Sequence, residues 1–169
     1  MAGQLERPDT DVFVAVAGVR YASNEVVFMI DVVEVEVAED DLVFVDANAM
    51  SDALAREGKI ALYGLFFDFD KADLKAESDP TLKELAKLLK QNPTQKYYVV
   101  GHTDLVGTFA YNQQLSRDRA RSVVTALVKR YGIASDRLEP HGVGPLVPVS
   151  TNTSDAGKAK NRRVELVVR

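Results

Sequence analysis

The chain has 169 residues, no cysteine, a hydrophobic fraction of 46% and a formal net charge of −4. This length suits one compact domain, or one domain with a smaller partner, and the missing cysteines exclude disulfides and thiolate metal sites. The negative charge argues against nucleic-acid binding, and no apolar run approaches the roughly 18 residues that a bilayer-spanning helix needs, so we expect membrane association only through a segment outside this sequence.

The first part of the chain is predicted to contain β structure. Residues 1–8 lack a basic start followed by an apolar run, so the sequence as written predicts no secretion signal. Residues 12–17 are apolar throughout, and residues 33–37 alternate between Val and Glu, which is the period-two pattern of a strand with one wet face. A turn at Asp40–Asp41 and a further short strand over 42–45 are expected to follow.

A helix is predicted over residues 47–57, ending at Gly58 as its C-cap. We therefore assign residues 1–58 to a small β-rich extension and residues 59–169 to the main domain. No linker rich in Pro, Gly or Ser separates the two parts, so we expect them to pack together. The extension is expected to bind an envelope protein partner or to self-associate through a strand edge.

From Lys59 onward the pattern alternates between strands and helices. Asp79 is expected to cap the first of these helices with Pro80 at its first position, and Gly132 to end the second. The predicted elements in chain order are a strand over 60–69, a helix over 80–91, a strand over 97–100, a helix over 109–131, and strands over 139–144 and 163–168. The order β-α-β-α-β-β predicts an α/β fold with helices packed on a mixed sheet.

Two charged residues near the second helix form a candidate site. Asp104 follows a strand between Gly101 and Gly107, where the backbone can turn sharply. Arg119 shares one shoulder of the helix with Asn112, Leu115 and Ser116. An aspartate and an arginine facing one groove suit a zwitterion, since the carboxylate accepts an ammonium and the guanidinium binds a carboxylate. The alternative is that Asp104 and Arg119 simply pair with each other on the surface.

Five sequence blocks in this order resemble OmpA-like domains of the OmpA, Pal and MotB type. They cover about residues 60–169, and together they are more specific than any one of them alone. The blocks are Phe67-Asp68-Phe69-Asp70-Lys71-x-Asp73-Leu74, Gly101-His102-Thr103-Asp104-x-x-Gly107, Asn112-x-x-Leu115-Ser116-x-x-Arg119-Ala120, Gly142-x-Gly144-x-x-x-Pro148 and Gly157-Lys158-Ala159-x-Asn161-Arg162-Arg163-Val164-Glu165.

The resemblance implies non-covalent binding of peptidoglycan through the diaminopimelate of its stem peptide. Asp104 would take the ammonium and Arg119 the carboxylate at the free end of diaminopimelate. It also implies that no cofactor is needed and that the protein lies in the periplasm of a Gram-negative bacterium, associated with the outer membrane. Lys158 stands where the family usually has arginine, away from the groove. Further positions that line the groove by this resemblance are Asp70, Thr103, Asn112, Leu115 and Arg162.

Metal-site alternatives are poorly supported. His102 and Asp104 provide two ligands, but with His141 as the only other histidine they fall short of a catalytic zinc site. A calcium loop starting at Asp68 would need glycine at its sixth position and glutamate at its twelfth, where this chain has aspartates. We therefore expect no metal.

An enzyme and an interaction domain are the remaining alternatives. Ser116, His102 and Asp104 have the residue types of a hydrolase, but Ser116 lies inside a predicted helix without a nucleophile elbow, so we expect no enzyme. The competing class is an interaction or structural domain with an empty groove, in which residues 1–58 carry the recognition. A short basic cluster is expected to be a solvated face; it comprises Lys158, Lys160, Arg162 and Arg163.

Overall fold

The structure, a computed structural model, describes residues 2–7, 10–20, 26–36, 46–68 and 70–169. It divides into two compact units, Met1–Asp41 and Leu42–Arg169, each of which is described by itself. The predicted turn at Asp40–Asp41 and the predicted strand over 42–45 lie outside the described residues.

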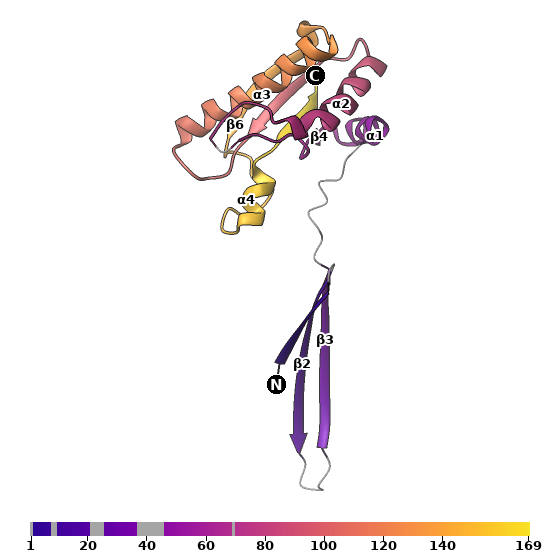
Figure 1. Cartoon of the computed structure of the whole chain (residues 1–169), viewed down its shortest axis with the longest axis vertical. Coiled ribbons are helices and arrows are strands. Elements are labelled where there is room, and N and C mark those ends of the chain that lie inside the picture. The colour runs from indigo at the N-terminus through magenta and orange to yellow at the C-terminus, as the bar shows by residue number, and fades with distance from the viewer. Residues whose placement is uncertain (1, 8–9, 21–25, 37–45, 69) are drawn as a thin grey trace. The chain divides into compact units, whose positions relative to one another are not determined.

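The first unit contains a three-stranded antiparallel sheet in the order β1-β2-β3 (Figure 1). Its strands are β1 (Ala2–Arg7), β2 (Thr10–Arg20) and β3 (Val26–Glu36). β2 and β3 are longer than the apolar and alternating runs that predicted them, because backbone pairing continues past those runs. β1 was missed, since its residues carry neither an apolar run nor a period-two pattern.

The second unit is a mixed four-stranded sheet packed with helices, which confirms the predicted fold class. The strand order is β4-β7-β5-β6, in which only the β5–β6 pair is parallel. Its elements are α1 (Ala47–Glu57), β4 (Lys59–Ala61), η1 (Ala76–Ser78), α2 (Asp79–Gln91), β5 (Tyr97–His102), α3 (Phe109–Tyr131), η2 (Ser135–Arg137), β6 (Leu138–Gly144), α4 (Asp155–Asn161) and β7 (Val164–Val168).

The predicted strand over 60–69 is wrong beyond Ala61, where β4 ends. The chain turns at Gly64, at which a Cβ atom would lie 2.1 Å from Oγ1 of Thr81 in α2. Leu62 and Leu65 are buried in the core, so the apolar run reflects packing against helices and not a continuous strand. Between this turn and η1, the described residues form only an isolated bridge, Phe67 with Leu74.

Two helix predictions also need correction. Helix α2 starts at Asp79 with Ser78 as its N-cap, so Asp79 is the first helical residue and Pro80 the second. The short helix α4 between β6 and β7 was not predicted at all. It has only seven residues, and its clearest local signal is Ser154, whose side chain accepts a hydrogen bond from the Gly157 amide.

Helix α1 belongs to the core of the second unit, although the sequence assigned it to the N-terminal extension. Its N-cap Asp46 accepts two backbone hydrogen bonds of 2.9 Å, and Gly58 ends it in the left-handed conformation, at φ 71°. Oε2 of Glu84 in α2 accepts a further hydrogen bond from the Ala47 amide at 2.9 Å. Ala47, Met50 and Leu54 are buried in the same hydrophobic core as α2.

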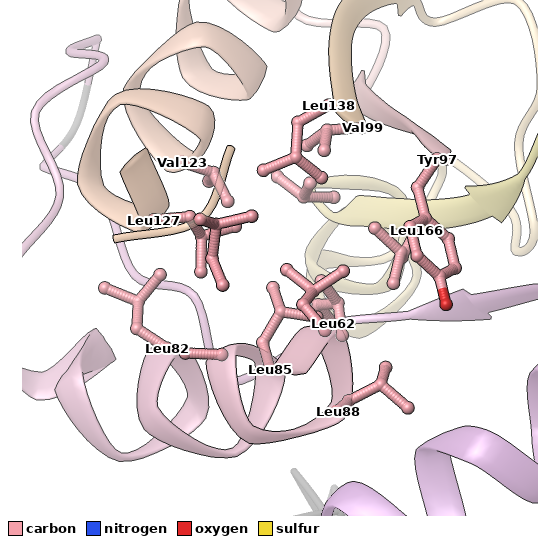
Figure 2. Close-up of a cluster of buried hydrophobic side chains, with 14 of the residues drawn as sticks. Leu62, Leu82, Leu85, Leu88, Tyr97, Val99, Val123, Leu127, Leu138 and Leu166 are labelled. Carbon is pink, nitrogen blue, oxygen red and sulfur yellow. The ribbon is translucent and has the colours of Figure 1, made fainter. Parts of the chain in front are cut away.

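The core lies where α2 and α3 pack together and against the sheet. Leucines of α2 meet Val123 and Leu127 of α3 and the inward side chains of β5, β6 and β7 (Figure 2). Helix α3 packs on β5 and β6, so the sheet fixes its position along its length. The side chains of Ala120, Val123 and Leu127 on the inner face of α3 are fully buried.

Leu127→Ala should lower the free energy of unfolding by about 2–5 kcal/mol, because it removes a fully buried side chain and leaves a cavity. Lys129→Ala, an exposed position on the same helix, should change it by less than about 0.5 kcal/mol. Urea unfolding followed by circular dichroism measures both. Equal effects at the two positions would contradict the core assignment.

Candidate ligand-binding site

Two glycines bring α3 unusually close to the ends of β5 and β6. A Cβ atom at Gly101 would lie 2.0 Å from the Ser116 carbonyl oxygen, and one at Gly142 would lie 2.2 Å from the Arg117 backbone nitrogen. The Ser116 hydroxyl accepts a hydrogen bond from the Gly144 amide and donates one to the Gln113 carbonyl, both at 2.9 Å. The close approach and the Ser116 hydrogen bonds together fix α3 beside the loop that follows β5.

Asp104 lies in that loop and is buried. Its Oδ1 accepts a hydrogen bond from the Val106 amide at 3.0 Å, and its Oδ2 accepts one from Nη1 of Arg162 at 2.7 Å. Asp104 and Arg119, both described residues, form no direct ion pair with each other. The partner of Asp104 is instead Arg162, which follows helix α4 and lies 58 residues further along the chain.

Arg119 is buried on α3, beside the segment that follows β4. Its Nε donates a hydrogen bond to the Lys71 carbonyl at 3.0 Å, and its guanidinium carbon lies 5.1 Å from the centre of the Phe67 ring. Burial, followed by the nearby charge of Arg162, lowers the pKa of Arg119. Among the described residues no hydrogen bond uses its two Nη groups, so this end of the guanidinium is available to a ligand carboxylate.

The remaining predicted site residues have different surroundings. Nδ2 of Asn112, which is buried, donates to the Val106 carbonyl at 2.9 Å and to the Asp104 carbonyl at 3.4 Å, so it supports the loop from α3. The Thr103 amide donates to the Gly144 carbonyl, and its buried hydroxyl has no partner within the described part of the chain. Leu115 is half-buried on α3 and its role stays a prediction.

Tyr111 joins the site although sequence reasoning missed it. Its hydroxyl donates a short hydrogen bond to Asp70, which has a left-handed backbone at φ 61°. This hydrogen bond is the main cause of a raised pKa for Tyr111. Tyr111 and Asp70 also raise the pKa of Arg119, which opposes the effect of its burial. The signal was present in the sequence, since Tyr111 and Arg119 are eight residues apart and lie near one face of the same helix.

A buried charge cluster lies beside the site, where β7 pairs with β5. Arg163 donates from Nε and Nη2 to Oε1 of Glu165 at 2.9 and 2.7 Å, and from Nη2 to the Val147 carbonyl at 3.2 Å. Nε2 of His102 lies 3.6 Å from Oε2 of Glu165. His102 and Arg163 hold the pKa of Glu165 down to about 2, although its burial opposes this.

The arrangement differs from the alternatives considered for the sequence. The Ser116 hydroxyl is bonded to backbone groups, and His102 faces Glu165, so these two do not form a hydrolase pair. No group of three acidic or histidine side chains in the described residues is placed to hold a metal ion. The basic cluster is not one solvated face, because Arg163 is buried and Arg162 is bound to Asp104.

Within the described residues, no helix combines the length and apolar character needed to cross a membrane.

A family model described as the OmpA family matches residues 66–162, more than half of the chain. The chain belongs to the OmpA family. Outer membrane porin F of Pseudomonas aeruginosa is 44% identical over 126 residues, which cover 75% of this chain and 35% of the relative. The chain spans between about a third and a half of the length of the first curated relatives it matches.

Solved structures give the same family fold. The peptidoglycan-associated lipoprotein of Burkholderia pseudomallei matches with a TM-score of 0.59 and 28% identity, covering 73% of this chain and all of that one. The cell wall anchor of the T6SS of Pseudomonas aeruginosa matches with a TM-score of 0.56 and 30% identity, covering 72% and 94%. The OmpA-like fold that the sequence blocks implied is confirmed.

The OmpA domain should lose stability in acid partly through Glu165. Its pKa is lower in the folded state than the ordinary value of 4.5, so its contribution is complete above pH 4.5 and is lost as the pH falls towards about 2. Glu165→Gln should therefore flatten the pH dependence of the free energy of unfolding over this window, as measured by denaturant titrations at several pH values. An unchanged slope in the variant would contradict the assigned pKa shift.

Proposed function

We propose that this chain binds peptidoglycan non-covalently and anchors an envelope component to the cell wall, in the periplasm beside the outer membrane. The observation that carries the proposal is the placement of Arg119 near Asp104. Both side chains are buried, and the Nη groups of Arg119 have no hydrogen-bonding partner among the described residues. A buried guanidinium with unused donors suits a ligand that brings its own carboxylate.

The charges of the site match a zwitterionic ligand. Arg119 and Arg162 supply two positive charges, and Asp104 and Asp70 supply two negative charges, all within electrostatic reach of Arg119 or bonded to one another. A ligand with one ammonium and one carboxylate enters such a site without leaving an excess charge in a buried place. The free end of diaminopimelate carries both groups on one carbon. In this proposal Asp104 takes the ammonium and Arg119 the carboxylate.

The names of the similar proteins support the location and the cell-wall role. They include an outer membrane porin, a peptidoglycan-associated lipoprotein and a cell wall anchor. Two of these are matched over nearly the whole length of the solved chain, so the likeness covers the complete folded domain. The periplasm is the compartment in which such a domain meets peptidoglycan.

The side chains of the site favour binding without bond cleavage. The Ser116 hydroxyl is held by backbone groups of Gly144 and Gln113, and it is not hydrogen-bonded to a general base. The buried His102 ring faces Glu165, so it is not placed as a base for a nucleophile. We therefore expect purified sacculi to release no soluble fragments when mixed with the protein.

A second candidate function is recognition by the N-terminal sheet, with an empty groove in the main unit. Strand β1 pairs with β2 only from Thr10 to Ala15, whereas β3 pairs with β2 from Thr10 to Arg20. Residues 16–20 of β2 therefore have one edge without a strand partner within the described part of the first unit. Such an edge accepts a strand of another protein or of a second copy of this chain.

Asp104→Ala and Arg119→Ala should each abolish co-sedimentation with purified sacculi of the diaminopimelate type. Removing one side of a buried, charge-assisted contact costs about 2–5 kcal/mol of binding free energy. The measurement is the fraction of protein in the pellet at increasing amounts of sacculi, with circular dichroism to establish that each variant is folded.

A matched pair on the same helix provides the control. Asp118 and Arg121 form an exposed ion pair of 2.9 Å, so Asp118→Ala and Arg121→Ala change the same charges outside the site. Both should pellet like the unmodified chain. If all five proteins pellet equally, or if none does, the groove is not the binding site and recognition by the N-terminal sheet becomes the favoured function.

A further inference from the structure

The carboxylate proposed to take the ligand's ammonium already holds a cation. Oδ1 of Asp104 accepts the Val106 amide, and Oδ2 accepts Nη1 of Arg162 at 2.7 Å. The Asp104 side chain is only 11% exposed, whereas the Arg162 side chain is 46% exposed. Arg162 is therefore a half-exposed side chain that binds a buried carboxylate.

Adding an ammonium beside Arg162 would place two cations on one carboxylate. Two like charges about 4 Å apart repel each other, and the repulsion is larger where protein replaces part of the screening water. The side chain of Arg162 can move away instead, since it is long, half-exposed and bonded in the described residues only to Asp104. Its backbone stays in place, because its amide donates to the Lys158 carbonyl at 3.1 Å. Exchange of one cation for another is therefore favoured over addition.

A ligand carboxylate near Arg119 provides a new partner for the displaced guanidinium of Arg162. The charge of Arg162 lowers the pKa of Arg119, and it is the largest cause after burial. A carboxylate placed between two guanidinium groups would relieve this repulsion. The same ligand carboxylate that Arg119 binds would therefore also compensate Arg162 for the loss of Asp104.

We propose that Arg162 determines the specificity of the site as a resident cation, which only a ligand carrying a carboxylate beside its ammonium displaces without loss. This inference rests on the proposed function. A diaminopimelate end group replaces the Asp104–Arg162 pair with two new ion pairs. A lysine end group has the ammonium but lacks the carboxylate on the same carbon. It therefore breaks the Asp104–Arg162 pair and leaves Arg162 without an anionic partner from the ligand.

The test is a calorimetric titration of the full chain with two tripeptides, L-Ala-γ-D-Glu-meso-diaminopimelate and L-Ala-γ-D-Glu-L-Lys. The unmodified chain should prefer the first. Arg162→Gln should bind the lysine peptide about two- to fivefold more tightly, the range expected for releasing a half-exposed ion pair. Its affinity for the diaminopimelate peptide should not rise, so the preference for diaminopimelate should fall.

Two further variants make the test decisive. Arg162→Lys keeps a cation for Asp104 and should retain a preference near that of the unmodified chain. Arg121→Gln removes the same charge from an exposed ion pair on α3 and should bind both peptides like the unmodified chain. Arg162→Gln should stay folded, as checked by thermal unfolding. If Arg162→Gln is unfolded, Arg162→Lys decides the test. Loss of the preference for diaminopimelate in Arg162→Lys would overturn the inference, and its retention would support it.

Other outcomes separate this inference from the function beneath it. If Arg162→Gln weakens binding of both peptides by the same factor, Arg162 is an ordinary contact and the inference fails while the proposed function stands. An unchanged affinity for both peptides in that variant overturns the inference in the same way. If the unmodified chain binds neither peptide, both the inference and the proposed diaminopimelate site fail.

Discussion

The close approach of α3 to the ends of β5 and β6 is the constraint on which the candidate site depends. Gly101 and Gly142 allow it, since a side chain at either position would overlap backbone atoms of Ser116 or Arg117. The approach lets the Ser116 hydroxyl bind the Gly144 amide, and it brings α3 beside the loop that carries Asp104. A wider spacing would separate Arg119 from Asp104, the two opposite charges of the proposed site. Gly101 and Gly142 thus determine how near the charge of Arg119 lies to the loop that carries Asp104.

Much of the fold follows from local pattern. Helix α3 was predicted with its observed limits because its apolar residues repeat at helical spacing and Gly132 ends it. The strand predicted over 60–69 failed because an apolar run does not distinguish a strand from a segment that turns to fill a helical core. Leu62 and Leu65 are buried in the core cluster, and no short-range pattern reports such contacts. Helix α4 is too short for periodicity to detect.

The site shows the same limit at the level of single residues. Asp104 and Arg119 were predicted from family blocks and from helical spacing; both are buried and lie within electrostatic reach of each other, and their role in binding stays a proposal. Their partners were not predicted, because Arg162 is 58 residues from Asp104 and Lys71 is 48 residues from Arg119. The neighbours Arg162 and Arg163 illustrate the reason. Arg162 is half-exposed and binds the buried Asp104, whereas Arg163 is buried against Glu165, and their identical side chains give no indication of which is which.

Helix α1 has a consequence for how such a domain is combined with other segments. Its N-terminus is bound by Asp46 and Glu84, and its apolar face completes the core on α2. A junction placed at residue 59, where the sequence predicts that the main domain begins, would cut away this face and leave apolar side chains of α2 in water. Fusion partners, or natural exchange of the N-terminal module, would therefore preserve the domain only when the joint precedes Asp46. The structural module is larger than residues 66–162, over which the family model matches.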